Sequence, residues 1–273
     1  MLTNETSHFA LTSGNIKRAM RKTYNMKVQT KKTTPRDTKL FESIAPVSDD
    51  VAFASLIDLA NVVGIYPVRF IRDLNIKRIR IGQKFVRRPT FYHPSMPFSV
   101  IGTMDSKQGN MYLDAGFVKT TFHHEVTHQL MATMNPDLLE LVTAEWEAIN
   151  QRNNLTYRGF DQAYSAQSSF LPQEGFASTY AQTSLLEDIP ETISSILGEP
   201  AFHLSRSAFD HALAAKSELS LRLLAATTEV IGIPEWQKNY QADLVAPPLY
   251  YLNEMHPFKY RVPSGEVRYI WVN

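Results

Sequence analysis

The most constraining feature of this chain is a pair of histidines four residues apart, His124 and His128, with a glutamate directly after the first. The surrounding run over residues 120–130 reads Thr-Thr-Phe-His-His-Glu-Val-Thr-His-Gln-Leu. On an α-helix, side chains at i and i+4 lie on one face, one turn apart. Both imidazoles could therefore reach one metal ion, and Glu125 would point toward the remaining coordination space.

The sequence around this pair favours a helix. Thr120 or Thr121 is expected to cap its N-terminus, and Asn135-Pro136 is expected to end it. Apolar residues recur at helical spacing and offer a buried face: Phe122, Val126, Leu130 and Met131. The pair therefore belongs to an H-E-x-x-H helix, an arrangement in which two histidines bind zinc and the glutamate serves as the general base of a peptidase.

Composition excludes several other kinds of site. The chain has 273 residues, is 44% hydrophobic and carries 15 Phe and 12 Tyr, which is enough for a sizeable core. It contains no cysteine, so disulfides, cysteine-ligated metals and a cysteine nucleophile are excluded. No segment has the apolar length needed to span a membrane. A secretory signal core is also missing, so a secreted or cell-envelope location is only slightly favoured over others.

Charge is unevenly distributed along the chain. The net charge is +1, but residues 1–40 carry nine Lys and Arg against Glu5 and Asp37 alone, which leaves residues 41–273 mildly acidic. We interpret residues 1–40 as a basic, flexible N-terminal arm, and residues 41–273 as the folded domain. Binding of nucleic acid through this arm is unlikely to be the main function, since a solvated leader has the same composition.

The order of expected elements indicates an α+β fold. Helices are expected at 15–24, 51–63, 136–150, 186–197 and 206–231, and strands at 77–81, 98–104, 110–113 and 266–272. Strands thus precede the H-E-x-x-H helix and helices follow it, which predicts a small mixed sheet and a mainly helical C-terminal part. In zinc peptidases with this motif, an edge strand upstream of the helix pairs with the substrate backbone. The candidates here are 98–104 and 110–113.

A catalytic zinc takes three protein ligands and leaves one position open for water. The residues after His128 include no third histidine at the short spacing of elongated zinc motifs, so a carboxylate is expected. Glu147 lies at a spacing used by several Glu-type zinc peptidases. Glu174, in Gln-Glu-Gly-Phe-Ala, resembles the ligand-bearing element of gluzincin aminopeptidases. Glu187 is the third candidate.

Two stretches bear on that choice: Gly-Phe-Ala-Ser-Thr-Tyr at 175–180 and Glu-Asp-Ile-Pro-Glu at 187–191. Together they resemble a pattern shared by a family of bacterial zinc-binding metallopeptidases of gluzincin type and by the catalytic domain of anthrax lethal factor. The resemblance implies Glu187 as the third zinc ligand and Tyr180 as a donor to the oxyanion. It also implies Glu191 as a carboxylate that holds a ligand histidine. Pro190 stands where the family usually has alanine, so the helix is expected to begin near Asp188 or to kink.

These features predict a zincin-like metalloendopeptidase that hydrolyses peptide bonds in a peptide or protein substrate. Zn²⁺ would be its cofactor, and Glu125 would be the general base on a zinc-bound water. A secreted toxin or effector protease with one narrow protein substrate is the first alternative. A binding module with a structural or vestigial zinc site is the second. His93 is interpreted as a loop residue. His203 and His211 are interpreted as structural residues, with a metal ligand or a transition-state donor as the alternative for either.

Overall fold

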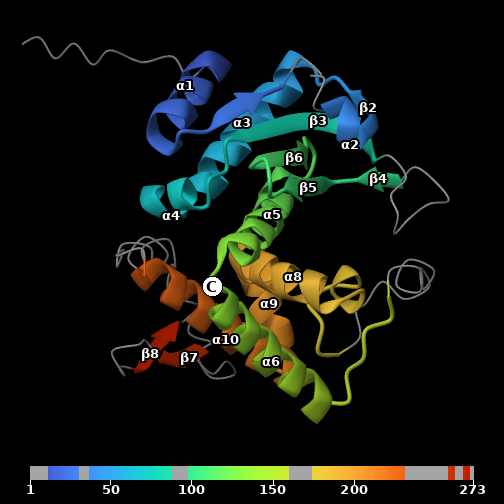
Figure 1. Cartoon of the computed structure of the whole chain (residues 1–273), viewed down its shortest axis with the longest axis vertical. Helices are drawn as coiled ribbons and strands as arrows, with labels where there is room; N and C mark the ends of the chain where they lie inside the picture. Colours follow the sequence, from blue (N-terminus) through green and yellow to red (C-terminus); the bar gives the residue numbers. More distant parts are fainter. Residues whose placement is uncertain are drawn as a thin grey trace, which may run out of the picture.

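The computed structural model describes residues 12–30, 37–87, 98–159, 174–230, 258–261 and 267–270. The fold is α+β, with a mixed sheet in one half and a helical assembly in the other (Figure 1). The sheet half comprises α1 (Ser13–Tyr24), β1 (Lys27–Gln29), α2 (Asp37–Leu40), β2 (Phe41–Ala45), α3 (Asp49–Gly64), α4 (Val68–Asp73), β3 (Arg78–Arg87), β4 (Phe98–Val100), β5 (Gly102–Asp105) and β6 (Asn110–Asp114).

The second half is mainly helical. It comprises α6 (Pro136–Arg152), the 3₁₀ turn η1 (Tyr180–Gln182), α8 (Leu185–Gly198), α9 (Pro200–Ser207), α10 (His211–Val230), β7 (Phe258–Arg261) and β8 (Val267–Ile270). Helix α5 (Val118–Thr133) runs from the sheet into this half and packs against α8 (Figure 1). No helix among the described residues combines the length and apolarity that crossing a membrane requires.

Strand β3 organises the sheet. Its first half pairs in parallel with β1 and β6, and its second half pairs antiparallel with β2 and β4. Ile79 and Ile81 are fully buried in the main core, as expected for alternate residues on one face of a strand. Arg78 lies on the other face, where its guanidinium binds Asp37 at 2.9 Å and the Tyr112 hydroxyl at 2.8 Å. The sheet is therefore covered on both faces.

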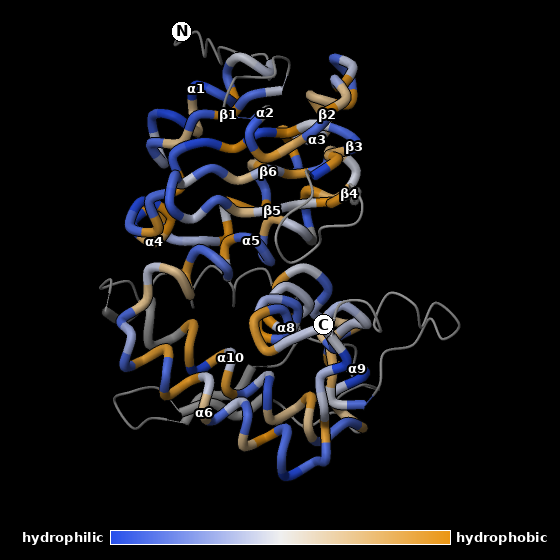
Figure 2. The backbone as a smooth tube through the Cα atoms, turned by 45° about the vertical axis from the view of Figure 1, so that its right-hand side comes forward, coloured by the Kyte–Doolittle hydropathy of each residue, from blue (hydrophilic) through white to orange (hydrophobic). Residues whose placement is uncertain are grey.

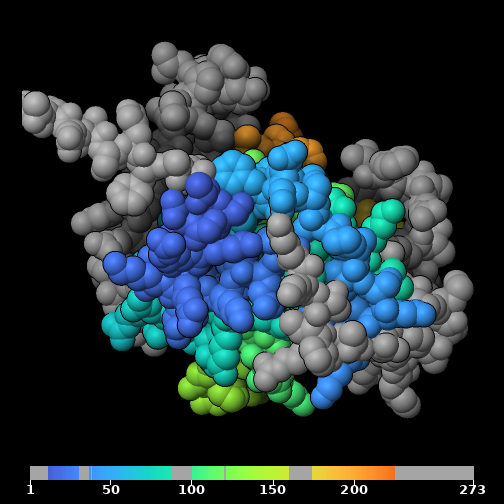
Figure 3. Space-filling view, turned by 90° about the horizontal axis from the view of Figure 1, so that it is seen from above, coloured from blue at the N-terminus to red at the C-terminus, as the bar shows by residue number. Residues whose placement is uncertain are grey.

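Part of the range expected to be a flexible arm is integral to this half. Residues 13–24 form α1, and Lys27–Gln29 pair with β3, while Ile16 and Met20 are buried in the core. From above, these residues lie in one continuous surface with the segments that follow (Figure 3). The basic composition of residues 1–40 did not indicate this packing. Two apolar residues one turn apart, Ile16 and Met20, are enough to dock a helix whose other faces are basic. Residues 1–11 and 31–36 lie outside the described residues.

The expected edge strands also need correction. Residues 110–113 fall in β6, which lies between β3 and β5 and therefore has both edges paired. Residues 98–104 divide at Ile101 into β4, which pairs with β3, and β5, which pairs antiparallel with β6. Among the described residues, β5 pairs on one side only. It is thus the strand that could accept a further strand.

Helix α5 is buried on nearly all sides, rather than on one face as its apolar spacing predicts. Phe122, Val126 and Leu130 face the core, and polar residues on its other sides are buried as well. The helix begins at Val118 with Phe117 at the N-cap position, so Thr120 and Thr121 lie inside the helix and not at its cap. In contrast, hydrophobic and hydrophilic residues alternate along α6 and α10, as expected of helices with one exposed face (Figure 2). A helix enclosed in this way presents its polar residues to interior partners.

Candidate metal centre

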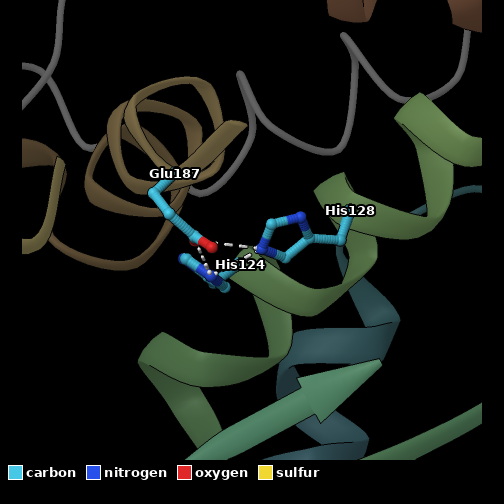
Figure 4. A group of neighbouring side chains, drawn as sticks. All are labelled: His124, His128 and Glu187. Carbon is cyan, nitrogen blue, oxygen red and sulfur yellow. Dashed lines mark hydrogen bonds and ion pairs between the residues drawn. The ribbon is translucent and has the colours of Figure 1, made fainter. Parts of the chain in front are cut away.

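Two elements bring three potential metal ligands together. His124 and His128 lie one turn apart on α5, and Glu187 lies in the first turn of α8, which packs across that helix (Figure 4). One ligand atom from each residue lies within 4.8 Å of the other two. Within the part of the chain that the structure describes, this is the one group of three or more such side chains able to hold a metal ion.

The separations of these atoms suit a tetrahedral ion. The Nε2 atoms of His124 and His128 are 2.9 Å apart, and Oε2 of Glu187 lies 3.2 Å from each. Tetrahedral zinc with bonds of about 2.0–2.1 Å places neighbouring ligand atoms about 3.3–3.4 Å apart. The triangle formed by the three ligand atoms is therefore slightly smaller than one face of such a tetrahedron. Two imidazoles and a carboxylate are also the ligand types that zinc accepts.

The electrostatics of this group favour a cation at the point of convergence. Burial alone would lower the pKa of His124, but the neighbouring carboxylates of Glu187 and Glu191 outweigh burial and raise it to about 10. Burial likewise opposes the charge on Glu187, yet hydrogen bonds from the two histidines lower its pKa to about 2. The surroundings thus stabilise a positive charge between these groups, and a divalent metal ion would satisfy the same demand.

Glu125 lies beside the group, almost completely buried. The residue is 4% exposed, and its Oε2 has no hydrogen-bond partner among the described residues. Burial raises the pKa of this carboxyl above its ordinary value, against the attraction of His124 and His128. A buried carboxylate oxygen without a partner is costly unless it serves a ligand or a water. This is the expected setting for a group that takes and returns a proton.

The β5 backbone lies directly against Glu125. A Cβ atom added to Gly102 would lie 2.9 Å from Oε1 of Glu125 and 2.0 Å from the Cγ2 methyl of Thr121. Only glycine therefore permits this approach of the edge strand to the helix. The sequence holds a signal for this contact, because an isolated glycine within an expected strand, here 98–104, often marks a close approach of the backbone.

Replacing Gly102 with alanine is expected to displace the Glu125 carboxylate. If Glu125 is the general base that its motif predicts, a shift of about 1 Å would cost about 100-fold in kcat. Crowding a buried site costs about 1–3 kcal/mol of stability. Steady-state kinetics and thermal unfolding would measure both. Combining Gly102→Ala with Thr121→Ser removes the clash with the methyl group and isolates the contact with Glu125. Gly64→Ala is the control, because nothing lies within 4 Å of its added Cβ. Wild-type kcat in the double variant would contradict this role of Gly102.

Glu191 lies one turn after Glu187 and contacts the other ring nitrogen of His124. Its Oε1 lies 2.7 Å from Nδ1 of His124, within ion-pair distance, although the angle falls short of a hydrogen bond. The other oxygen of Glu191 accepts a 2.5 Å hydrogen bond from the Ser178 hydroxyl. A carboxylate at Nδ1 orients the imidazole and leaves Nε2 for a metal. This arrangement is consistent with the role that the sequence resemblance implies for Glu191.

Tyr180 begins η1 and lies beside the group. Its ring centroid is 5.9 Å from that of His124, and the two planes are inclined by 41°. The side chain is half-buried. The expected role of Tyr180 as a hydrogen-bond donor to the oxyanion stays a prediction.

The two alternative carboxylates lie elsewhere. Glu147 is exposed on α6 and Glu174 is exposed before η1, and neither belongs to the His-His-Glu group. The helix that carries Glu187 begins at Leu185, earlier than Pro190 led us to expect. Proline lacks an amide hydrogen, so only the carbonyl of Leu186 loses its helical donor. The proline is thus accommodated inside α8, without moving the helix start to Asp188.

The remaining histidines have structural surroundings where they are described. His203 is 1% exposed between the hydroxyls of Ser195 (2.9 Å) and Ser217 (2.6 Å), and burial lowers its pKa to about 4. His211 is exposed at the start of α10. His123 contacts the Tyr66 hydroxyl at 2.7 Å, away from the metal group. His93 lies outside the described residues.

Comparison with known proteins adds little. No family model matches the sequence, and no curated protein matches it. Among solved structures, the chain is similar to that of a putative zinc-binding metallo-peptidase from Bacteroides caccae, with 16% identity and a TM-score of 0.42 over 82% of this chain and 86% of that one. At this level of identity and superposition, the likeness does not assign the chain to a family.

Proposed function

We propose that this chain is a zinc-dependent hydrolase of peptide bonds. The observation that carries the proposal is the convergence of Nε2 of His124, Nε2 of His128 and Oε2 of Glu187 at 2.9–3.2 Å, with a buried carboxylate, Glu125, beside them. Three ligands that leave one position open are typical of catalytic zinc, whereas structural zinc is usually closed by four protein ligands.

In the proposed mechanism, His124, His128 and Glu187 would hold a zinc ion, which would supply Lewis acidity to the reaction. Glu125 would accept a proton from the attacking water and pass it to the leaving amine. Its burial suits this task, because a raised pKa brings the carboxyl closer to the working pH. Tyr180 would donate a hydrogen bond to the oxyanion. Glu191 would keep the His124 ring oriented toward the metal.

The substrate backbone is proposed to pair with β5. This strand has a free edge among the described residues, and its Gly102 lies against Glu125. An extended peptide added to that edge would pass next to the general base. The zincin-like fold, the gluzincin subtype and the likeness to the lethal factor catalytic domain belong to the same proposal. They are supported by the residues at 175–180 and 187–191.

Anomalous diffraction at the zinc absorption edge, on crystals of the purified protein, tests the proposal. We expect one peak per chain, bound by His124, His128 and Glu187, with a water next to Glu125. A peak enclosed by four protein ligands would instead indicate a structural zinc. The absence of a peak after soaking in zinc would contradict the proposed function.

A further inference from the structure

One buried lysine, Lys216 of α10, contacts Asp188, the residue next to Glu187. Its side chain is 0% exposed. The ammonium donates to the carbonyl of Gly175 at 2.7 Å and to Oδ2 of Asp188 at 2.7 Å, and it lies 4.1 Å from the centroid of the Phe176 ring. The ammonium thus has two oxygen acceptors and a cation–π contact with an aromatic face.

The partners of Lys216 belong to two segments that supply the site. Asp188 is adjacent to Glu187, the proposed third ligand, in the first turn of α8. Gly175 begins the stretch that leads through Ser178 to Tyr180, and Ser178 binds Glu191. A single ammonium therefore ties the first turn of α8, which carries Glu187, to the segment that leads to Tyr180.

Asp188 is held from several directions. Its Oδ2 also accepts hydrogen bonds from the Trp146 indole at 2.8 Å and from the Tyr157 hydroxyl at 3.0 Å. Burial raises the pKa of Asp188 and lowers that of Lys216, so desolvation opposes both charges. Buried ion pairs seldom add stability over apolar residues of similar size. Fixing the relative positions of neighbouring segments is a role that buried ion pairs serve in some proteins.

The backbone from Gly175 to Ala177 is fixed by two further side chains of the α9–α10 region. The amide of Gly175 donates to Oδ2 of Asp210 at 2.6 Å. Arg206 donates to the carbonyls of Phe176 at 2.7 Å and Ala177 at 2.5 Å. Four backbone groups in three consecutive residues are thus bound by side chains from one corner of the fold. Of these side chains, only Lys216 also reaches α8.

We propose that Lys216 is a positioning residue for the metal centre, whose ammonium sets Glu187 and Tyr180 relative to the two histidines by joining Asp188 to Gly175. Lys216 touches neither the metal ligands nor the substrate in this role. The inference rests on the proposed function, because it assigns Lys216 to the geometry of that same site.

The test compares Lys216→Met with the double variant Lys216→Met/Asp188→Asn. The single variant leaves a carboxylate buried without its cation and is expected to unfold at a lower temperature. The double variant removes both charges and should recover most of that stability, but it still lacks the tie to Gly175. We expect its zinc affinity, measured by chelator competition, to be 10–100-fold weaker than that of the wild type. The spectrum of its Co²⁺-substituted form should also shift.

The matched control is Arg78→Met/Asp37→Asn, which removes the buried ion pair on the sheet (2.9 Å). This change should alter stability without altering zinc affinity. Wild-type zinc affinity and an unchanged Co²⁺ spectrum in the Lys216→Met/Asp188→Asn protein would overturn the proposal.

Hydrogen–deuterium exchange in the metal-free proteins separates this inference from the proposed function. We expect faster exchange over 174–190 in both Lys216 variants, with α5 unchanged. Exchange at the wild-type rate would overturn the positioning role, whether or not the protein binds zinc. Failure of the wild type itself to bind zinc would instead refute the proposed function.

Discussion

Replacing Glu125 with glutamine is expected to remove nearly all peptide hydrolysis while zinc remains bound. Glutamine keeps the size of the side chain but cannot accept the proton, and a positioned general base is worth about 10²–10⁴-fold in rate. The metal ligands are not altered. Initial rates on a panel of unrelated unstructured peptides, together with zinc content per chain, would measure both effects.

The control for this experiment is Glu147→Gln, because Glu147 is an exposed glutamate outside the metal group. It should retain wild-type rates and zinc content. A Glu125→Gln protein that cleaves as fast as the wild type would show that another group serves as the base. Cleavage of only one peptide of the panel by the wild type would favour the narrow effector protease over a general endopeptidase.

Replacing Glu187 with glutamine is expected to weaken zinc binding by more than about 100-fold. Even residues that only support a metal ligand cost about 10–100-fold in affinity when changed, and a ligand should cost more. In the wild type, the two histidines stabilise the negative charge of Glu187 and lower its pKa to about 2. The amide of glutamine lacks that charge. Chelator competition with a zinc indicator at neutral pH would measure the loss.

Glu147→Gln and Glu174→Gln are the matched controls for Glu187, since both carboxylates were candidates for the third ligand. Each is exposed and outside the His-His-Glu group, so neither change should alter zinc affinity. If Glu174→Gln lost zinc while Glu187→Gln retained it, the assignment of the third ligand would be wrong. The three variants therefore decide between all the candidates that the sequence left open.

Much of the helical structure was predictable from local patterns. Helices expected at 51–63, 136–150 and 186–197 are observed as α3, α6 and α8, with ends that differ by three residues or fewer. Periodicity identified them because each packs one apolar face against the core. The expected helix at 206–231 is broken near Asp210, which accepts a hydrogen bond from the Leu213 amide and caps α10. That break carried a local signal, an aspartate at a helix start.

Other features were not predictable in this way. Residues 13–29 looked like part of a solvated basic arm, yet α1 and β1 dock through a few apolar side chains and through pairing with β3. The edge of the sheet was also misplaced, because pairing β6 with β3 involves residues about thirty positions apart. Loop closure over such distances depends on the whole fold, and no short window records it.

The metal centre combines both kinds of information. By itself, the sequence determined that His124, Glu125 and His128 share one helix, because four residues complete about one turn regardless of the surroundings. Only the tertiary structure decided which carboxylate joins them. Glu187 reaches the histidines because α8 packs across α5, and its first turn is held at Asp188 by Trp146 of α6 and Lys216 of α10. Spacing within a helix is a local property of the backbone, whereas the meeting of two helices depends on contacts contributed by the entire chain.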